Sequence, residues 1–143
     1  MLILKEVPWY KDTKLSNISL GSLMVVIMVQ STLLHLRSRD FYLVANSLAV
    51  LGNSAPQAIH LHAYAARRIV ALLDILSRRL LLLQKRQSEV ENGNVGSYED
   101  CLWTLLGALN STLTHALPRN LHLVYELLHR REVHKLFREK FLG

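Results

Sequence analysis

The stretch AYAARRIVALLDILSRRLLLLQKR, residues 63–86, has the most regular pattern in the chain. Its apolar side chains recur at intervals of three and four residues, which is typical of one face of an α-helix. The spacing predicts a long helix that begins near His62 and ends at about Arg86. Its apolar face consists of Ile69, Leu72, Leu73, Leu76, Leu80 and Leu83. Other apolar residues lie outside this face and predict contact with more than one neighbour: Val70, Ile75, Leu81 and Leu82.

Basic side chains of the same segment form two rows, one opposite the apolar face and one along its flank. The plain interpretation is a solvated outer face. The alternative is a surface for an acidic protein partner or an anionic cytoplasmic leaflet, where each residue contributes about 1 kcal/mol. The net charge of +6 is compatible with such partners. The opposite row is Arg67, Arg78 and Lys85, and the flanking row is Arg68, Arg79 and Arg86.

Upstream of this helix lies an uncharged segment, Leu15–Leu36. As a helix it would extend for roughly 33 Å, which is enough to cross a bilayer. Its continuous apolar run is short, Leu23–Val29, and polar side chains dilute both ends. We therefore expect a helix that is buried on most sides within a protein. The alternative is a small integral membrane protein anchored by a helix at residues 15–36.

The segment FYLVANSLAVL, residues 41–51, predicts another helix. Asp40 precedes it as the N-cap, and Gly52, Asn53 and Pro56 end it. Apolar residues occupy two of its faces, so we expect two neighbours. One face has Phe41, Val44, Ala45 and Leu48, and the opposite side has Leu43 and Val50.

The polar stretch QSEVENGNVGS, residues 87–97, predicts a flexible loop between two helices. Ser97 and Asp100 have the spacing of a capping box, which predicts that a helix at residues 98–117 starts here. Pro118 follows the end of that helix.

The carboxy-terminal residues predict one or two more helices. Asn120 is the expected N-cap of the segment LHLVYELLHRR, residues 121–131, whose apolar residues repeat the helical spacing. A last short helix, or a continuation of this one, is marked by Val133, Leu136 and Phe137.

Together these segments predict an all-α fold of five to six helices joined by short turns, without a strand or hairpin. Several helices are apolar on two sides. This favours the stacked helical pairs of an armadillo-like or HEAT-like α-solenoid over a four-helix bundle with solvated outer faces. We expect residues 1–143 to form a single helical region that is part of a larger α-solenoid.

Two groups of histidines are candidates for a metal site. His60 and His62 lie about 200° apart on a helix, and no nearby Cys, Asp or Glu completes a zinc site. We expect histidines at a helix entrance, one of them hydrogen-bonded. His122 and His129 share a face with Glu126, but about 10 Å of helix axis separates the two histidines. We expect a polar face there, with a local Glu126–His129 pair and no metal.

Catalytic motifs are absent from the sequence. It lacks GxSxG, a phosphate-binding glycine loop, HExxH and CxxC. Cys101 is the single cysteine and is expected to be a buried thiol. Nucleic acid is disfavoured as a partner because no aromatic residues interleave with the arginines. We therefore expect a protein that is not an enzyme and uses no cofactor and no small-molecule substrate.

The amino-terminal stretch MLILKEVPWYKD, residues 1–12, lacks the features of a targeting segment. It has no basic n-region, no long apolar run and no small-residue cleavage site, so we expect no signal peptide. The second residue is Leu, so we expect no N-myristoylation.

Short patterns in four segments occur in a characteristic order. The segments are WYKDTKLSNISLGSLMVVIMV, RDFYLVANSLAVLGNSA, LHAYAARRIVALLDILSRR and NLHLVYELLHRREVHKLF. The most telling pieces are Trp9-Tyr10-Lys11, Ile18–Leu23, Arg39-Asp40, Leu61-His62 with Tyr64-Ala65-Ala66, and Leu123-Val124-Tyr125 with Leu127-Leu128. In this order, from Trp9 to about Phe141, they resemble the carboxy-terminal region of the dymeclin family, a eukaryotic Golgi-associated family.

This resemblance implies an α-solenoid at the cytoplasmic face of the Golgi apparatus. It implies a non-enzymatic scaffold, peripheral at the membrane, that takes part in Golgi organisation and vesicle trafficking through protein or membrane-surface contacts. Dymeclins are much longer than this chain, so we expect a fragment or a short isoform. The resemblance supplies no catalytic, cofactor or metal residues.

Overall fold

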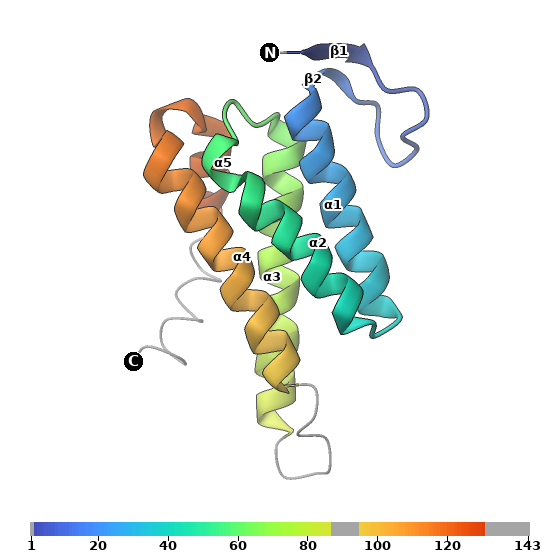
Figure 1. Cartoon of the computed structure of the whole chain (residues 1–143), viewed down its shortest axis with the longest axis vertical. Helices are drawn as coiled ribbons and strands as arrows, with labels where there is room; N and C mark the ends of the chain where they lie inside the picture. Colours follow the sequence, from blue (N-terminus) through green and yellow to red (C-terminus); the bar gives the residue numbers. More distant parts are fainter. Residues whose placement is uncertain (1, 87–94, 131–143) are drawn as a thin grey trace.

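A computed structural model describes residues 2–86 and 95–130, and these residues are mostly helical (Figure 1). The predicted all-α fold is confirmed. The predicted helix around Val133–Phe137 and residues 87–94 of the predicted loop lie outside the described residues. The α-helices are α1 Leu20–Arg37, α2 Phe41–Ser54, α3 Ala63–Lys85, α4 Val95–Ala116 and α5 Leu121–His129. Two short 3-10 helices, Ala55–Gln57 and Leu117–Arg119, follow α2 and α4.

The helices form two layers, with α1, α3 and α5 in the first layer and α2 and α4 in the second. α1 packs against α2, and α3 against α4, as antiparallel pairs (Figure 1). The second pair stacks on the first so that α3 lies beside α1 and α4 beside α2, each running in the same direction as its neighbour. α5 then packs against α3. Parallel helices side by side are typical of stacked helical pairs, whereas neighbours in an up-and-down bundle alternate in direction. The predicted solenoid-like stack is therefore confirmed.

The apolar face of α3 lies at the centre of the core. Leu72 and Leu76 have no exposed surface, and Val70, outside the main face, is buried as well. Since α3 contacts α1, α4 and α5, the predicted multiple neighbours of this helix are confirmed. Truncating a fully buried leucine to alanine in such a core costs about 2–5 kcal/mol.

A short antiparallel strand pair precedes α1, so the prediction that the chain has no strand was wrong. β1 Ile3–Glu6 pairs with β2 Ser16–Ser19, with Leu4 opposite Ile18. Asn17 has a left-handed φ of 51°, which an α-helix does not accommodate. The helix expected from Leu15 therefore begins only at Leu20.

Capping explains where α1 and α2 start. The Oγ of Ser19 accepts a 3.1 Å hydrogen bond from the backbone N–H of Ser22 at the start of α1. At α2, Asp40 is the predicted N-cap, and its Oδ1 accepts a 3.1 Å bond from the N–H of Leu43. α2 contacts α1 and α4, which confirms its two predicted neighbours, and it extends to Ser54, beyond the predicted stop.

Two capping predictions near α4 and α5 need correction. α4 starts by Val95, so Ser97 lies inside the helix and neither caps it nor ends the loop. Asn120 does occupy the N-cap position of α5, but its side chain makes no bond to that helix. Its Oδ1 accepts from Leu61 N–H at 3.2 Å, and its Nδ2 donates to the carbonyls of Ala58 at 2.7 Å and Ala116 at 3.1 Å. Asn120 thus joins two turns that are distant in sequence.

α1 is less buried than the sequence predicts. Val26 and Val29 pack in the core, whereas Leu20 and Leu34 are 53% and 62% exposed. Among the described helices, α1 alone is long and apolar enough to cross a membrane, and 39% of that window is buried in the fold. A core helix of a water-soluble stack has the same length and composition.

Candidate functional site

The basic residues predicted as a partner surface all lie on α3 or immediately after it. The row opposite the apolar face, Arg67, Arg78 and Lys85, is exposed. In the flanking row, Arg68 and Arg79 are half-buried and Arg86 is exposed. The two rows therefore have different access to a partner.

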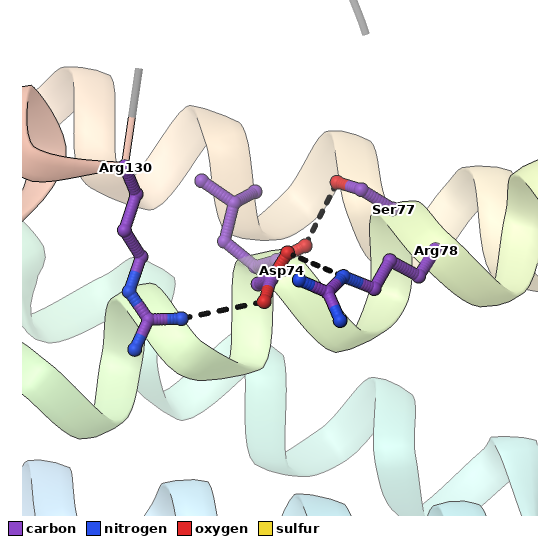
Figure 2. A network of polar contacts seen from close by, with 5 residues as sticks. Asp74, Ser77, Arg78 and Arg130 are labelled. Atoms are coloured by element: carbon purple, nitrogen blue, oxygen red, sulfur yellow. Dashed lines mark hydrogen bonds and ion pairs between the residues drawn. The ribbon is translucent and has the colours of Figure 1, made fainter. Parts of the chain in front are cut away.

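Asp74 neutralises part of the positive charge of the exposed row (Figure 2). The Oδ1 of Asp74 lies 3.0 Å from the Nε of Arg78, and its Oδ2 lies 3.3 Å from an Nη of Arg130 at the end of α5. The Asp74 side chain is only 13% exposed, so α3 and α5 are joined by a largely buried carboxylate. Sequence reasoning missed this residue, although the spacing of Asp74 and Arg78 is that of a helical ion pair. No local pattern points to Arg130.

Arg68 has a different environment from the rest of the basic residues. It lines a hollow of about 520 Å³ between α1 and α3, together with Arg37 and Asp12. Apolar residues of α1, among them Ile27 and Leu34, form much of the remaining wall. Arg68 is therefore part of a mixed, concave surface that the helical pattern of α3 alone does not reveal.

The paired histidines lie at the start of α3, and His62 is its N-cap. His62 Nδ1 accepts a 3.1 Å hydrogen bond from Tyr64 N–H, and its Nε2 lies 3.1 Å from the carbonyl oxygen of Ser16. Since Nδ1 accepts, the proton is on Nε2, which donates to that carbonyl. His60 has a left-handed φ of 50°, and its N–H donates to the carbonyl of Arg119 at 2.7 Å. The predicted histidine-bearing helix entrance is confirmed.

Two tyrosines close the same end of the stack. The hydroxyls of Tyr10 and Tyr64 are 3.0 Å apart, and their rings meet edge to face at 5.9 Å. Burial raises the pKa of the Tyr10 phenol above its ordinary value, and the hydrogen bond with Tyr64 raises it further. The contact holds the turn after β1 against α3. It brings together two of the short patterns on which the family resemblance depends.

A second hollow, of about 410 Å³, opens beside this end. Its wall includes His60 and His62 from the approach to α3, Arg119 from the turn after α4, and His122 from the first turn of α5. Among residues 2–86 and 95–130, no group of three or more His, Cys, Asp or Glu side chains has a geometry that could hold a metal ion. The structure thus brings predicted histidines together without forming a metal centre.

The local pair predicted on α5 does not form. The ion pairs of the described residues do not include Glu126 with His129. His129 instead stacks on Tyr125, with ring centroids 5.7 Å apart and 12° between the planes. Stacking places the imidazole over the preceding turn, which explains why the prediction was wrong.

The family model described as "Dymeclin: Dyggve-Melchior-Clausen syndrome protein" matches residues 1–142. The chain belongs to the dymeclin family. The resemblance seen in the short patterns is thereby confirmed. The family and its matched relatives bear no enzyme name.

Dymeclins from distant organisms are similar to the chain. The Xenopus laevis dymeclin is 34% identical over 152 residues, which cover 96% of this chain and 23% of that protein. The Drosophila melanogaster dymeclin is 33% identical over 153 residues, covering 96% and 22%. The Dictyostelium discoideum dymeclin is 39% identical over 92 residues, covering 64% and 10%. The chain thus spans less than a quarter of the length of these dymeclins. No solved structure matches it.

Proposed function

We propose that the chain is a non-enzymatic scaffold of the dymeclin type. It acts at the cytoplasmic face of the Golgi apparatus, in Golgi organisation and vesicle trafficking, through contacts with proteins or with the membrane surface. Membership of the dymeclin family supports this proposal, as does a fold whose open surfaces are helix faces. Small-molecule substrates and nucleic acid have no part in it.

The proposal depends on the surface of α1 and α2, the helical pair at one end of the stack, which we call the open face. α2 contains no charged residue, and α1 contains only Arg37, at its last position. Large apolar side chains nevertheless remain exposed on these helices, namely Leu20, Leu34, Tyr42, Leu43 and Val50, at 53%, 62%, 77%, 37% and 42%. These exposed apolar side chains, on helices with almost no charge, support the proposed protein contact.

Golgi localisation tests the proposal. The full chain with a fluorescent tag is expected to concentrate with a Golgi marker. Replacing Leu34 and Tyr42 with Asp should disperse it, because two carboxylates would be placed on the open face. Replacing Asn110 and Thr114, which are exposed on α4 and not on α1 or α2, with Asp is the matched control for added charge. A uniform distribution of the unmodified chain would contradict the proposal.

The exposed members of the two basic rows, Arg67, Arg78, Lys85 and Arg86, are the proposed contact with acidic partners or anionic membrane. Because Arg78 already pairs with Asp74, the remaining charge lies on Arg67, Lys85 and Arg86. We expect the chain to sediment with vesicles containing phosphatidylserine at low salt and to be released at high salt. Changing these residues to Gln should abolish sedimentation. The matched control removes equal charge elsewhere, at Lys5, Lys11 and Arg39. Binding that is insensitive to salt would exclude this surface.

A second candidate function is that of a small integral membrane protein anchored by α1. The length and composition of α1 favour it. Alkaline carbonate separates the two candidates, because it releases a peripheral protein and leaves a spanning one in the pellet. Recovery of the chain in the pellet would replace the scaffold proposal by this one.

A further inference from the structure

We infer that the hollow at the shared start of α3 and α5 binds a phosphoryl group, from a soluble phosphate monoester or from a phosphorylated lipid headgroup. The inference goes beyond the scaffold role and does not depend on it, because the hollow would exist in a chain that binds no protein.

The hollow is built by three segments that are far apart in sequence. β2 contributes Asn17, the approach to α3 contributes His60 and His62, and the turn after α4 contributes Arg119. His122 belongs to the first turn of α5. The segments are fixed to one another, since His60 N–H donates to the Arg119 carbonyl at 2.7 Å and the buried Asn120 side chain bonds to both turns. The wall is therefore formed before any ligand binds.

The lining of the hollow is rich in donors and cations and contains no carboxylate. The whole wall consists of Asn17, His60, Leu61, His62, Ala63, Pro118, Arg119, Leu121 and His122. Within the part of the chain that the structure describes, none of the ion pairs involves Arg119. Arg119 thus lines the hollow without an acidic partner among these residues. Asn17 adds an amide donor to the same wall.

The helix starts strengthen this lining. α3 and α5 both begin at the hollow, and the first N–H groups of a helix have no intrahelical acceptor. The side chain of Asn120 does not cap α5, because it is engaged with Leu61, Ala58 and Ala116. The positive end of α5 is thus left open toward the hollow.

The number and spread of the donors favour a phosphoryl group over a carboxylate. One guanidinium can satisfy both oxygens of a carboxylate. Here Arg119 is joined by imidazoles and an amide from other segments, an arrangement that suits the several terminal oxygens of a phosphate ester. The volume of about 410 Å³ is adequate for a phosphate ester on a small ring.

The three histidines contribute unequally. Both ring nitrogens of His62 are already used, Nδ1 as an acceptor and Nε2 toward the Ser16 carbonyl. The side chains of His60 and His122 are exposed and make no such bonds among the described residues. Together with Arg119 they are the groups that can donate hydrogen bonds to the ligand.

Titration of the full chain with inorganic phosphate and with inositol monophosphate, followed by amide NMR, tests the inference. We expect saturable shifts centred on Leu61, Ala63 and His122. Arg119→Gln should weaken binding about tenfold. His122→Gln should weaken it about threefold. Arg39→Gln and His115→Gln are matched controls, because both side chains are exposed and neither lines the hollow.

Two results would overturn the inference. One is equal binding by the Arg119→Gln and Arg39→Gln variants when both remain folded by circular dichroism. The other is the same set of shifts with an equal ionic strength of chloride, which would show screening in place of a site. His60→Gln gives an independent check should Arg119→Gln fail to fold, and it too should weaken binding.

Vesicles distinguish the two sources of the phosphoryl group. If vesicles with a phosphatidylinositol monophosphate bind the chain much more tightly than soluble inositol monophosphate does, and Arg119→Gln removes this gain, the source is a lipid headgroup. If vesicles give no gain, the ligand is a soluble ester. Either outcome supports the hollow. Vesicle binding that survives Arg119→Gln, with no binding of the soluble probes, would overturn it.

Discussion

The hydroxyl of Ser22 in α1 accepts a 2.9 Å hydrogen bond from the backbone N–H of His62, the residue that caps α3. The same hydroxyl lies 3.0 Å from Ser19 Oγ, and Ser22 is only 1% exposed. A single buried hydroxyl thus joins the starts of two parallel helices of the same layer.

Replacing Ser22 with Ala should lower the free energy of unfolding by about 1–3 kcal/mol, because the half-buried His62 N–H would lose its acceptor. Urea denaturation measures the change. Ser16→Ala is the control, since Ser16 is exposed and contributes only its backbone carbonyl to His62. Equal losses in the two variants would mean that the hydrogen bond between Ser22 and His62 does not stabilise the fold.

Asn120→Ala should be more damaging still, with a loss of about 2–4 kcal/mol. The change removes the side-chain hydrogen bonds to Leu61, Ala58 and Ala116 and leaves the bond from His60 N–H to the Arg119 carbonyl to join the two turns. Thermal unfolding measures it, with Asn46→Ala as the control, because Asn46 is exposed on α2. If Asn120→Ala unfolds at the same temperature as the control, the buried amide is not what joins the turns.

Asp74→Asn should weaken the attachment of α5 to α3. The Arg130 side chain is 29% exposed and would lose its ion pair, so we expect a loss of about 1–2 kcal/mol. Arg78→Gln should cost less, at most about 0.5 kcal/mol, because Arg78 is 69% exposed. Hydrogen exchange provides the measurement: amides of α5 should exchange faster in Asp74→Asn, while amides of α2 keep their rates. Unchanged exchange in α5 would show that apolar packing alone holds this helix.

The buried thiol of Cys101 predicts how stability depends on alkaline pH. Burial, with a smaller contribution from the Asp100 carboxylate, raises the pKa of Cys101 from 9.0 to about 11. The folded chain therefore keeps a proton that the unfolded chain loses. The resulting stabilisation is present below pH 9 and is lost as the pH rises toward 11, by up to about 2 kcal/mol.

The Cys101→Ala variant separates this effect from the titration of other groups, such as Tyr10. Its free energy of unfolding should differ from that of the unmodified chain by a constant amount below pH 9, and the difference should shrink above it. At pH 8 the thiol should also react with iodoacetamide far more slowly in the folded chain than in urea. Fast reaction of the folded chain would contradict the predicted burial.

Helical spacing was sufficient to predict most of the fold. The face of α3 from Ile69 to Leu80 is buried where its pattern placed it, and Asp40 caps α2 through the bond that its position predicts. The strand pair was missed because its strands are only four residues long, ILKE and SNIS, and lack a run of β-branched or aromatic residues. Its stability comes from Leu15 and Ile18, which pack into a core formed by distant helices.

The candidate sites were harder to predict, because they combine residues from several segments. The sequence pointed to His60 with His62 and to His122 with His129 as two unconnected groups, and it gave Arg119 no role. Their meeting depends on the turns around Ala58 and Asn120, which lie 62 positions apart. Likewise, the capping role expected of Asn120 fails because the fold supplies Leu61 N–H as a competing donor. Local propensity does not include such partners.

The two returns from the second layer to the first, at residues 55–62 and 117–120, are bonded to each other at the same edge of the molecule. These hydrogen bonds hold the two returns in a fixed register. An inserted residue in either return would move the bonded groups apart, so changes in the length of a return should be poorly tolerated. Lengthening the stack by duplication would therefore require copying a return together with its helices, so that every new helical pair is hydrogen-bonded to its neighbour through its own return.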